Sequence, residues 1–253
     1  MDSLEDRRTL LDATFLHKLV NHKIDSLFAS GHVIFKVSLK IPIGKSQYMS
    51  FCGGSVMAEN KVLTAAHCLT EDGNFCEKLF KKYKTKSLMK LYVVAGTLRN
   101  LARYQRDEQG TEQWRKMTKV SIPRRYWFPQ NDICVVFTDA PFVYNDYVKP
   151  LPLASRRWDY GSMDCVASGW GKINEQMQGD SGGPLVCRGT GDPNDKGQGV
   201  IVGVACGYAI RKYRRDSFFT RVTSYLGFLR NEATTTTPVF CIVLLSQIIS
   251  NFN

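Results

Sequence analysis

Short apolar runs, each bounded by glycine, proline or charged residues, recur along most of this chain. Residues 33–39 alternate between apolar and polar side chains, and residues 51–57 form the next run, with glycines where the backbone approaches a neighbour closely. Many short strands without a long helical period predict an all-β sandwich or barrel. One short terminal helix is expected at 225–232. The other expected strands are 91–96, 133–137, 164–170, 183–187, 200–205 and 218–222.

The chain is basic, because 34 Lys and Arg residues outnumber 23 Asp and Glu residues and leave a net charge of +11. Its 253 residues, 43% of them hydrophobic, suffice for a large core in one all-β unit or a pair of barrels. The lysines between 78 and 90 and the basic residues 211–215 form two clusters. Such clusters either attract polyanions, sulfated glycans or a membrane surface, or are solvated surface loops. No zinc-finger or RNA-binding pattern is present, so nucleic acid is not an expected partner.

Eight cysteines are spread along the chain without a Cys-x-x-Cys pair. This spacing disfavours a metal centre or a redox motif, and nothing in the sequence calls for a cofactor. Structural disulfides in an oxidising compartment are the better interpretation. Residues 1–8 are rich in charge and no continuous apolar segment follows them, so no signal peptide is visible. Either the true N-terminus precedes this sequence or the protein is not exported, and the expected disulfides favour the first.

Three local motifs carry candidate chemistry. Ser181 lies in the segment Gly-Asp-Ser-Gly-Gly-Pro at 179–184, a glycine-rich turn whose N–H groups can point at a developing oxyanion. His67 lies in Thr-Ala-Ala-His-Cys at 64–68, and Asp132 enters an apolar strand between them. These motifs, in the order His, Asp, Ser, strongly resemble the trypsin/chymotrypsin family of serine endopeptidases.

The resemblance covers about residues 31–229 and implies an all-β fold of two antiparallel six-stranded barrels, with the active site between them and a short C-terminal helix. We expect a trypsin-like domain at 24–232, an N-terminal or pro-segment at 1–23, and a Thr-rich linker with an apolar tail at 233–253. An extracellular location follows from the same resemblance.

The resemblance also implies a role for each motif residue. The Ser181 hydroxyl attacks a peptide carbonyl, His67 takes its proton and later returns it, and Asp132 orients the imidazole. The N–H groups of Gly179 and Ser181 form the oxyanion hole, where one donor contributes on the order of 3 kcal/mol. The implied substrates are proteins or peptides, and this chemistry uses no metal.

Two disulfides follow from the resemblance, Cys52–Cys68 beside the histidine and Cys165–Cys187 beneath the nucleophile loop. Each is worth roughly 3 kcal/mol if formed. No partner is assigned to the four other cysteines, at 76, 134, 206 and 241, and free buried thiols are the simplest expectation for 134 and 206.

The resemblance also implies residues for zymogen activation and for substrate specificity. In the family, cleavage after a basic residue frees an apolar N-terminus that pairs with the acid before the serine. Ile24 and Asp180 are the candidates here, and the alternative is that residues 23–24 are an ordinary exposed dipeptide. The family's residue six before the serine floors the primary pocket, which gives Glu175 and a preference for Arg or Lys. Cys206 and Tyr208 are expected in the opposite wall.

The chain departs from the family between the acid and the serine. The family separates these two by about ninety positions, whereas only residues 172–178 lie here between the Gly-Trp-Gly motif at 169–171 and the nucleophile segment. Relative to the family, the residues missing at this point would form two strands of the second barrel.

Three interpretations of the sequence stand: a serine endopeptidase or a shortened form of one, a non-catalytic homologue that binds a partner, and an incomplete transcript or gene model. We expect the first barrel, 31–141, to resist proteolysis better than the second, with early cuts at 172–178 or after 211–215.

The tail carries an apolar run at 239–249 after a threonine-rich linker. This run has about half the length that spans a bilayer as a helix. It either packs on the barrel, attaches the protein to a membrane, or forms a disordered end.

Overall fold

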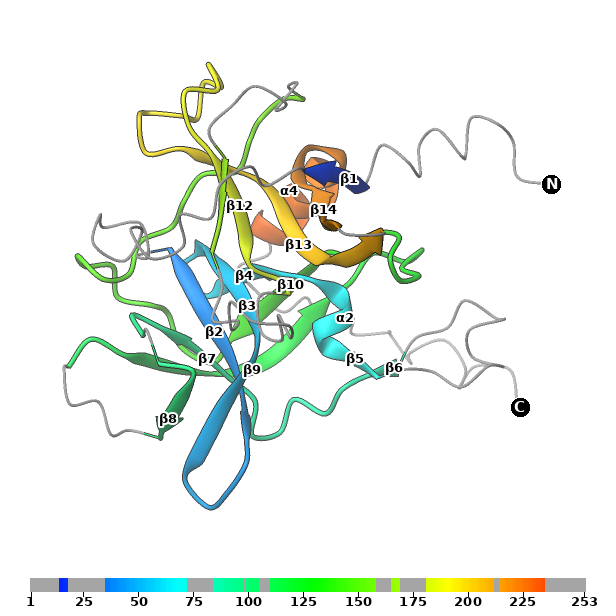
Figure 1. Cartoon of the computed structure of the whole chain (residues 1–253). Coiled ribbons are helices and arrows are strands. Elements are labelled where there is room, and N and C mark those ends of the chain that lie inside the picture. The colour runs from blue at the N-terminus through cyan, green and yellow to red at the C-terminus, as the bar shows by residue number, and fades with distance from the viewer. Residues whose placement is uncertain are drawn as a thin grey trace, which may run out of the picture.

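The structure, a computed structural model, describes residues 14–17, 35–71, 84–97, 99–104, 110–157, 165–168, 181–211 and 214–234. These residues are mostly β-strand and form two main sheets, with one short C-terminal helix, α4 (Leu226–Thr234). The predicted all-β, trypsin-like architecture is confirmed, and Figure 1 shows the strands of the second sheet grouped against one side of the first.

The first sheet closes into a barrel of six strands, as the resemblance implied. β3 pairs with both β2 and β4, which completes the ring, and β8 (Leu101–Arg103) is hydrogen-bonded to β3 outside it. A short helix, α2 (Ala66–Leu69), and the strand pair β5 (Thr70–Glu71) and β6 (Lys84–Thr85) follow β4. Around the ring the strands are β2 (Lys36–Pro42), β7 (Tyr92–Ala95), β9 (Gln113–Ser121), β10 (Cys134–Thr138), β4 (Lys61–Thr64) and β3 (Gln47–Ala58).

Among the described residues, the second sheet has five strands and stays open. The expected shortening of the second barrel is therefore confirmed. At one edge a strand from the N-terminal segment, which the sequence pattern did not predict, pairs antiparallel with the sheet from Thr14 opposite Thr220 to His17 opposite Ser217. In order, the strands are β1 (Thr14–His17), β14 (Arg214–Arg221), β13 (Val200–Arg211), β12 (Pro184–Cys187) and β11 (Cys165–Ala167).

The two sheets share one hydrophobic core. Val37 and Val135 of the barrel belong to the same buried cluster as Ile201 of β13 and Leu229 of α4. Val200 and Val202, the neighbours of Ile201, belong to a second buried cluster with Leu185 and Phe219. This alternation is the period of two expected of a strand that is covered on both faces. Packing against the barrel therefore substitutes for closure of the second sheet.

The apolar runs predicted most strands, and β9 shows why some were missed. Only Met117 of its nine residues is buried, and most of the others are charged or polar. A strand on the barrel's outer wall carries too little apolar periodicity to be recognised. Within the described part of the chain, no helix is long and apolar enough to cross a membrane.

Candidate active site

His67 and Asp132 are brought together from segments far apart in the sequence. His67 lies in α2, directly after β4, and Asp132 lies just before β10, which pairs with β4. The Nδ1 atom of His67 lies 2.7 Å from Oδ2 of Asp132, and the backbone N–H of His67 donates to Oδ1 at 2.8 Å. Because an ionised carboxylate only accepts hydrogen bonds, Nδ1 is the donor and Nε2 is left as the basic nitrogen. Asp132 is fully buried, whereas 24% of the His67 side chain is exposed.

Asp132 is held by residues that the sequence reasoning did not assign to the site. The Thr220 hydroxyl donates to the carbonyl oxygen of Asp132 at 2.8 Å, and the Tyr225 hydroxyl donates to Oδ1 of Asn131 at 2.8 Å. Burial raises the pKa of the Tyr225 hydroxyl, and the nearby charge of Asp132 raises it further. β14 and the 3₁₀ turn η2 (Val222–Tyr225) thus fix the acid of the barrel from the second sheet.

Cys206 also lies against Asp132. The Sγ atom of Cys206 lies 3.8 Å from the carbonyl oxygen of Pro129, and Cys206 is only 2% exposed to solvent. Burial and the nearby charge of Asp132 raise the pKa of the Cys206 thiol. Burial raises the pKa of the Cys134 thiol in the same way. The expectation of free, buried thiols at Cys134 and Cys206 is confirmed.

Ser181 is positioned by its backbone on the barrel. Its carbonyl oxygen accepts a hydrogen bond from the N–H of Gly53 at 2.7 Å, and the N–H of Gly182 donates to Ala205 of β13 at 2.7 Å. Gly182 has a φ of +80°, and a Cβ there would collide with the Thr64 hydroxyl and the Gly53 carbonyl. Thr64 ends the strand that leads into α2. The Ser181 turn therefore packs against the segment that carries His67.

The described side chains do not include a hydrogen bond between Ser181 Oγ and His67. Nε2 of His67 instead lies 3.8 Å from Sγ of Cys68. Catalytic hydrogen bonds are often long in a substrate-free site and tighten when substrate binds. The exposed ring of Phe128 packs edge-on against the His67 ring at 5.5 Å and forms one side of the site. No sequence signal indicated this aromatic contact.

Both predicted disulfides are formed, Cys52–Cys68 and Cys165–Cys187. The first joins β3 to α2, and so fixes the helix turn of His67 to the strand that holds Ser181. The sulfur atoms of Cys52 and Cys68 lie close to His67. They are bonded to each other, however, and offer no thiolate for a metal.

Several predicted site residues lie outside the described residues. These are Gly179 of the oxyanion hole, Asp180 and Ile24 of the activation pair, and Glu175 of the pocket floor. Tyr208 lies in β13 opposite Ser217, but its side chain is not among those described. Cys76, Cys241 and the apolar run at 239–249 are also outside the described residues, and so are several of the lysines between 78 and 90.

Comparison with known proteins agrees with this fold. A family model described as Trypsin matches residues 29–177, which is more than half of the chain and ends just before the Ser181 turn. The chain therefore belongs to the trypsin family.

Individual relatives are similar to different extents. The chain is 31% identical to coagulation factor IX of Oryctolagus cuniculus over 133 residues, which cover 49% of this chain and 40% of that protein. It is 23% identical to anionic trypsin of Canis lupus familiaris over 255 residues, covering 82% of this chain and 90% of the relative. Trypsin-3 of Salmo salar is 24% identical over 252 residues, covering 81% of this chain and 92% of that protein.

Proposed function

We propose that this protein is a secreted serine endopeptidase that hydrolyses peptide bonds through an acyl-enzyme. Oγ of Ser181 attacks the carbonyl carbon of the scissile bond while Nε2 of His67 takes its proton. The tetrahedral intermediate collapses as His67 returns this proton to the leaving amine. Water then attacks the acyl-enzyme by the same proton path and releases the carboxylic acid.

The observation that carries the proposal is the pair of hydrogen bonds from His67 to the buried carboxylate of Asp132. These bonds use both carboxylate oxygens, and so hold the imidazole in one orientation with its basic nitrogen outward. The Ser181 turn is tied to the same region through Gly53. A buried acid, a partly exposed histidine and a serine on a glycine turn form the arrangement that makes a serine hydroxyl nucleophilic.

The finer parts of the proposal concern residues beyond these contacts. The N–H groups of Gly179 and Ser181 stabilise the oxyanion, and Glu175 at the base of the primary pocket selects Arg or Lys. The pairing of a new N-terminus at Ile24 with Asp180 converts a zymogen to the active form. Two disulfides in the described part of the chain support an oxidising, extracellular setting.

A second candidate function is a non-catalytic member of the family that acts by binding a partner. The open second sheet favours it, because the family's primary pocket is built largely from that half of the molecule. The lack of a hydrogen bond between the described Ser181 and His67 side chains favours it as well.

Turnover of short reporter substrates decides between the two functions. Purified protein, with and without cleavage after Lys23, is incubated with reporters that end in Arg, Lys or Phe. The endopeptidase proposal expects turnover by wild type and none by Ser181→Ala, with Arg and Lys reporters preferred. Comparable rates on Phe reporters would contradict the role of Glu175, and turnover that survives in Ser181→Ala would exclude the mechanism.

A further inference from the structure

A strand of the N-terminal segment covers one edge of the second sheet. β1 pairs antiparallel with one side of β14, from Thr14 opposite Thr220 to His17 opposite Ser217, and β13 pairs with the other side. Figure 1 shows β1 next to β14. Without β1, β14 would be the last strand of the described sheet on this side. The free edge of a sheet presents unpaired N–H and C=O groups that readily accept another strand.

β14 holds the buried acid of the candidate site. The hydroxyl of Thr220, which lies opposite Thr14, donates to the carbonyl oxygen of Asp132 at 2.8 Å. Thr220 and its neighbour Phe219 are both almost completely buried. Successive residues of a strand point to opposite faces, so β14 is covered on both faces at this point. Its edge is therefore the side that packing leaves to β1.

β14 is also linked to the Ser181 turn, through β13. Phe219 pairs with Ala205 of β13. The N–H of Ala205 donates to the carbonyl oxygen of Gly183 at 2.8 Å, and the carbonyl oxygen of Ala205 accepts a hydrogen bond from Gly182 at 2.7 Å. Movement of β14 would therefore disturb the proposed nucleophile as well as the acid.

The sequence of β1 suits an added strand. Residues 14–17 are Thr-Phe-Leu-His, which include a β-branched and an aromatic residue and no proline. We propose that β1 is a built-in donor strand, which replaces a strand that the shortened second half lacks and holds β14 in place against Asp132 and the Ser181 turn. Main-chain hydrogen bonds supply the affinity of such strand addition.

The segment that carries β1 is then a working part of the folded domain and not only a pro-segment. A cut after Lys23 would break the covalent link to β1 but leave its pairing with β14 intact. The inference does not rest on the proposed endopeptidase activity.

A β1 proline variant, Phe15→Pro combined with Leu16→Pro, tests the proposal in the full chain. Successive N–H groups of a strand point to opposite sides, so one of the two prolines must remove a donor to β14. We expect hydrogen exchange at 217–220 to become at least about tenfold faster, because an edge strand opens more readily than a strand with two partners. Exchange in β10 of the barrel should not change.

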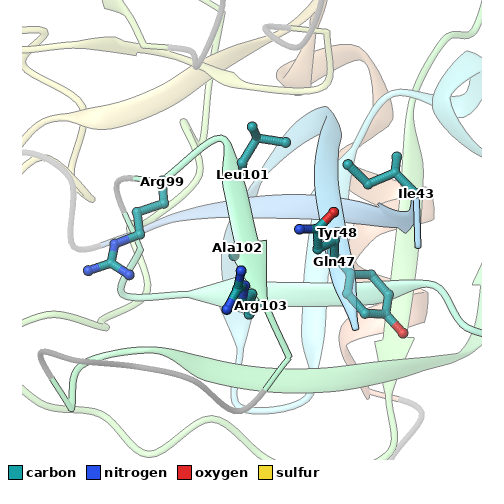
Figure 2. Close-up of a pocket in the computed structure, with 7 residues that line it drawn as sticks. All are labelled: Ile43, Gln47, Tyr48, Arg99, Leu101, Ala102 and Arg103. Carbon is teal, nitrogen blue, oxygen red and sulfur yellow. The ribbon is translucent and has the colours of Figure 1, made fainter. Parts of the chain in front are cut away.

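A β8 proline variant, Leu101→Pro combined with Ala102→Pro, is the matched control. β8 is also a short outer strand, and Ala102 lies opposite Tyr48 of β3. Figure 2, a close-up of the pocket at this strand pair, shows these three residues. The control should speed exchange at 47–49 and leave exchange in β14 as it is in the wild type.

The readout at the site is the proton between Nδ1 of His67 and the carboxylate of Asp132. A hydrogen bond of 2.7 Å to a carboxylate gives this proton a far-downfield NMR signal. We expect the signal to be lost in the β1 proline variant, because a looser Asp132 lets the proton exchange with water, and to persist in the β8 proline variant. No turnover is measured, so failure of the endopeptidase proposal would leave this result unchanged.

A synthetic peptide of residues 9–20 should act as the strand in trans. Added to the β1 proline variant, it should restore the His67 signal and slow the exchange at 217–220. A peptide that carries the same two prolines should do neither.

A cross-strand disulfide gives a second test should the β1 proline variant not fold. Leu16 and Phe218 lie directly opposite each other, at a separation that a disulfide spans. Leu16→Cys combined with Phe218→Cys should therefore form a disulfide, whereas Leu16→Cys combined with Ser217→Cys should not. The proposal would be overturned by unchanged exchange at 217–220 in the β1 proline variant, by equal loss of the His67 signal in both proline variants, by failure of the peptide to restore that signal, or by the absence of a disulfide between positions 16 and 218.

Discussion

The carbonyl oxygen of Ser181 accepts a hydrogen bond from the N–H of Gly53 at 2.7 Å. Gly53 follows Cys52, whose disulfide partner Cys68 is the residue after His67. One short stretch of β3 therefore connects the backbone of the proposed nucleophile to the proposed base. This connection is present although the described strands of the second sheet do not close into a barrel.

Replacing Gly182 by alanine should displace the Ser181 turn. A Cβ at Gly182 would lie 2.5 Å from the carbonyl oxygen of Gly53, and the φ of +80° already disfavours a side chain. Because the obstacle is backbone, we expect the free energy of unfolding to fall by about 2 kcal/mol or more and reporter turnover to fall at least tenfold. Urea denaturation and turnover measure the two effects.

Gly189→Ala is the matched control for this change. Gly189 has a φ of +63° but open space where a Cβ would lie, so only the backbone conformation is penalised, at about 1 kcal/mol. Equal destabilisation of the two variants would show that the contact with Gly53 does not matter.

Asp132→Asn should nearly abolish turnover while the protein stays folded. An amide at this position favours the wrong imidazole tautomer and removes the charge that stabilises imidazolium, which costs about 10⁴-fold in a serine protease triad. Asp146→Asn serves as the control, since the Asp146 side chain is 95% exposed and its ion pair is with the nearby Lys149. A loss below tenfold in Asp132→Asn would argue that His67 and Asp132 form a structural pair.

Lys40 should make stability rise with pH. Burial lowers the pKa of its ammonium from 10.5 to about 8, against the opposing charge of Glu112. Between pH 8 and 10.5 the unfolded chain therefore binds more protons than the folded one, so the free energy of unfolding increases across this window. Urea denaturation of wild type and Lys40→Met at several pH values isolates the effect of Lys40. The titration of all other groups cancels when the free energies of unfolding of the two proteins are subtracted at each pH. Parallel pH curves for the two proteins would contradict it.

Hydrogen exchange should distinguish the closed barrel from the open sheet. β3, β4 and β10 have strand partners on both sides, whereas β11 pairs only with β12 among the described strands. We expect the slowest exchange in the first group and the fastest in β11, since an edge strand opens without disturbing its neighbours. Uniform protection would show that the second sheet is closed by some other contact.

The sequence predicted those features that depend on local pattern. Apolar runs located most strands, and the motifs around His67 and Asp132 identified two residues that the fold brings into contact. Lys40 was not predicted, because a lysine in an alternating strand is normally exposed, and its burial depends on carbonyl groups of Arg99 and Asn100 that are distant in the chain. The support of Asp132 by Thr220 was missed for the same reason: it arises only when the second sheet packs on the barrel.

Labelling with a fluorophosphonate probe tests the central claim most directly, because the probe reacts with an activated serine whatever the substrate preference. We predict covalent labelling of wild type, with the adduct mapped by mass spectrometry to Ser181, and no labelling of Ser181→Ala. Labelling should also be lost in His67→Ala, since the hydroxyl is then without its base. Equal labelling of wild type and Ser181→Ala, or none of a folded wild type cleaved after Lys23, would contradict the account.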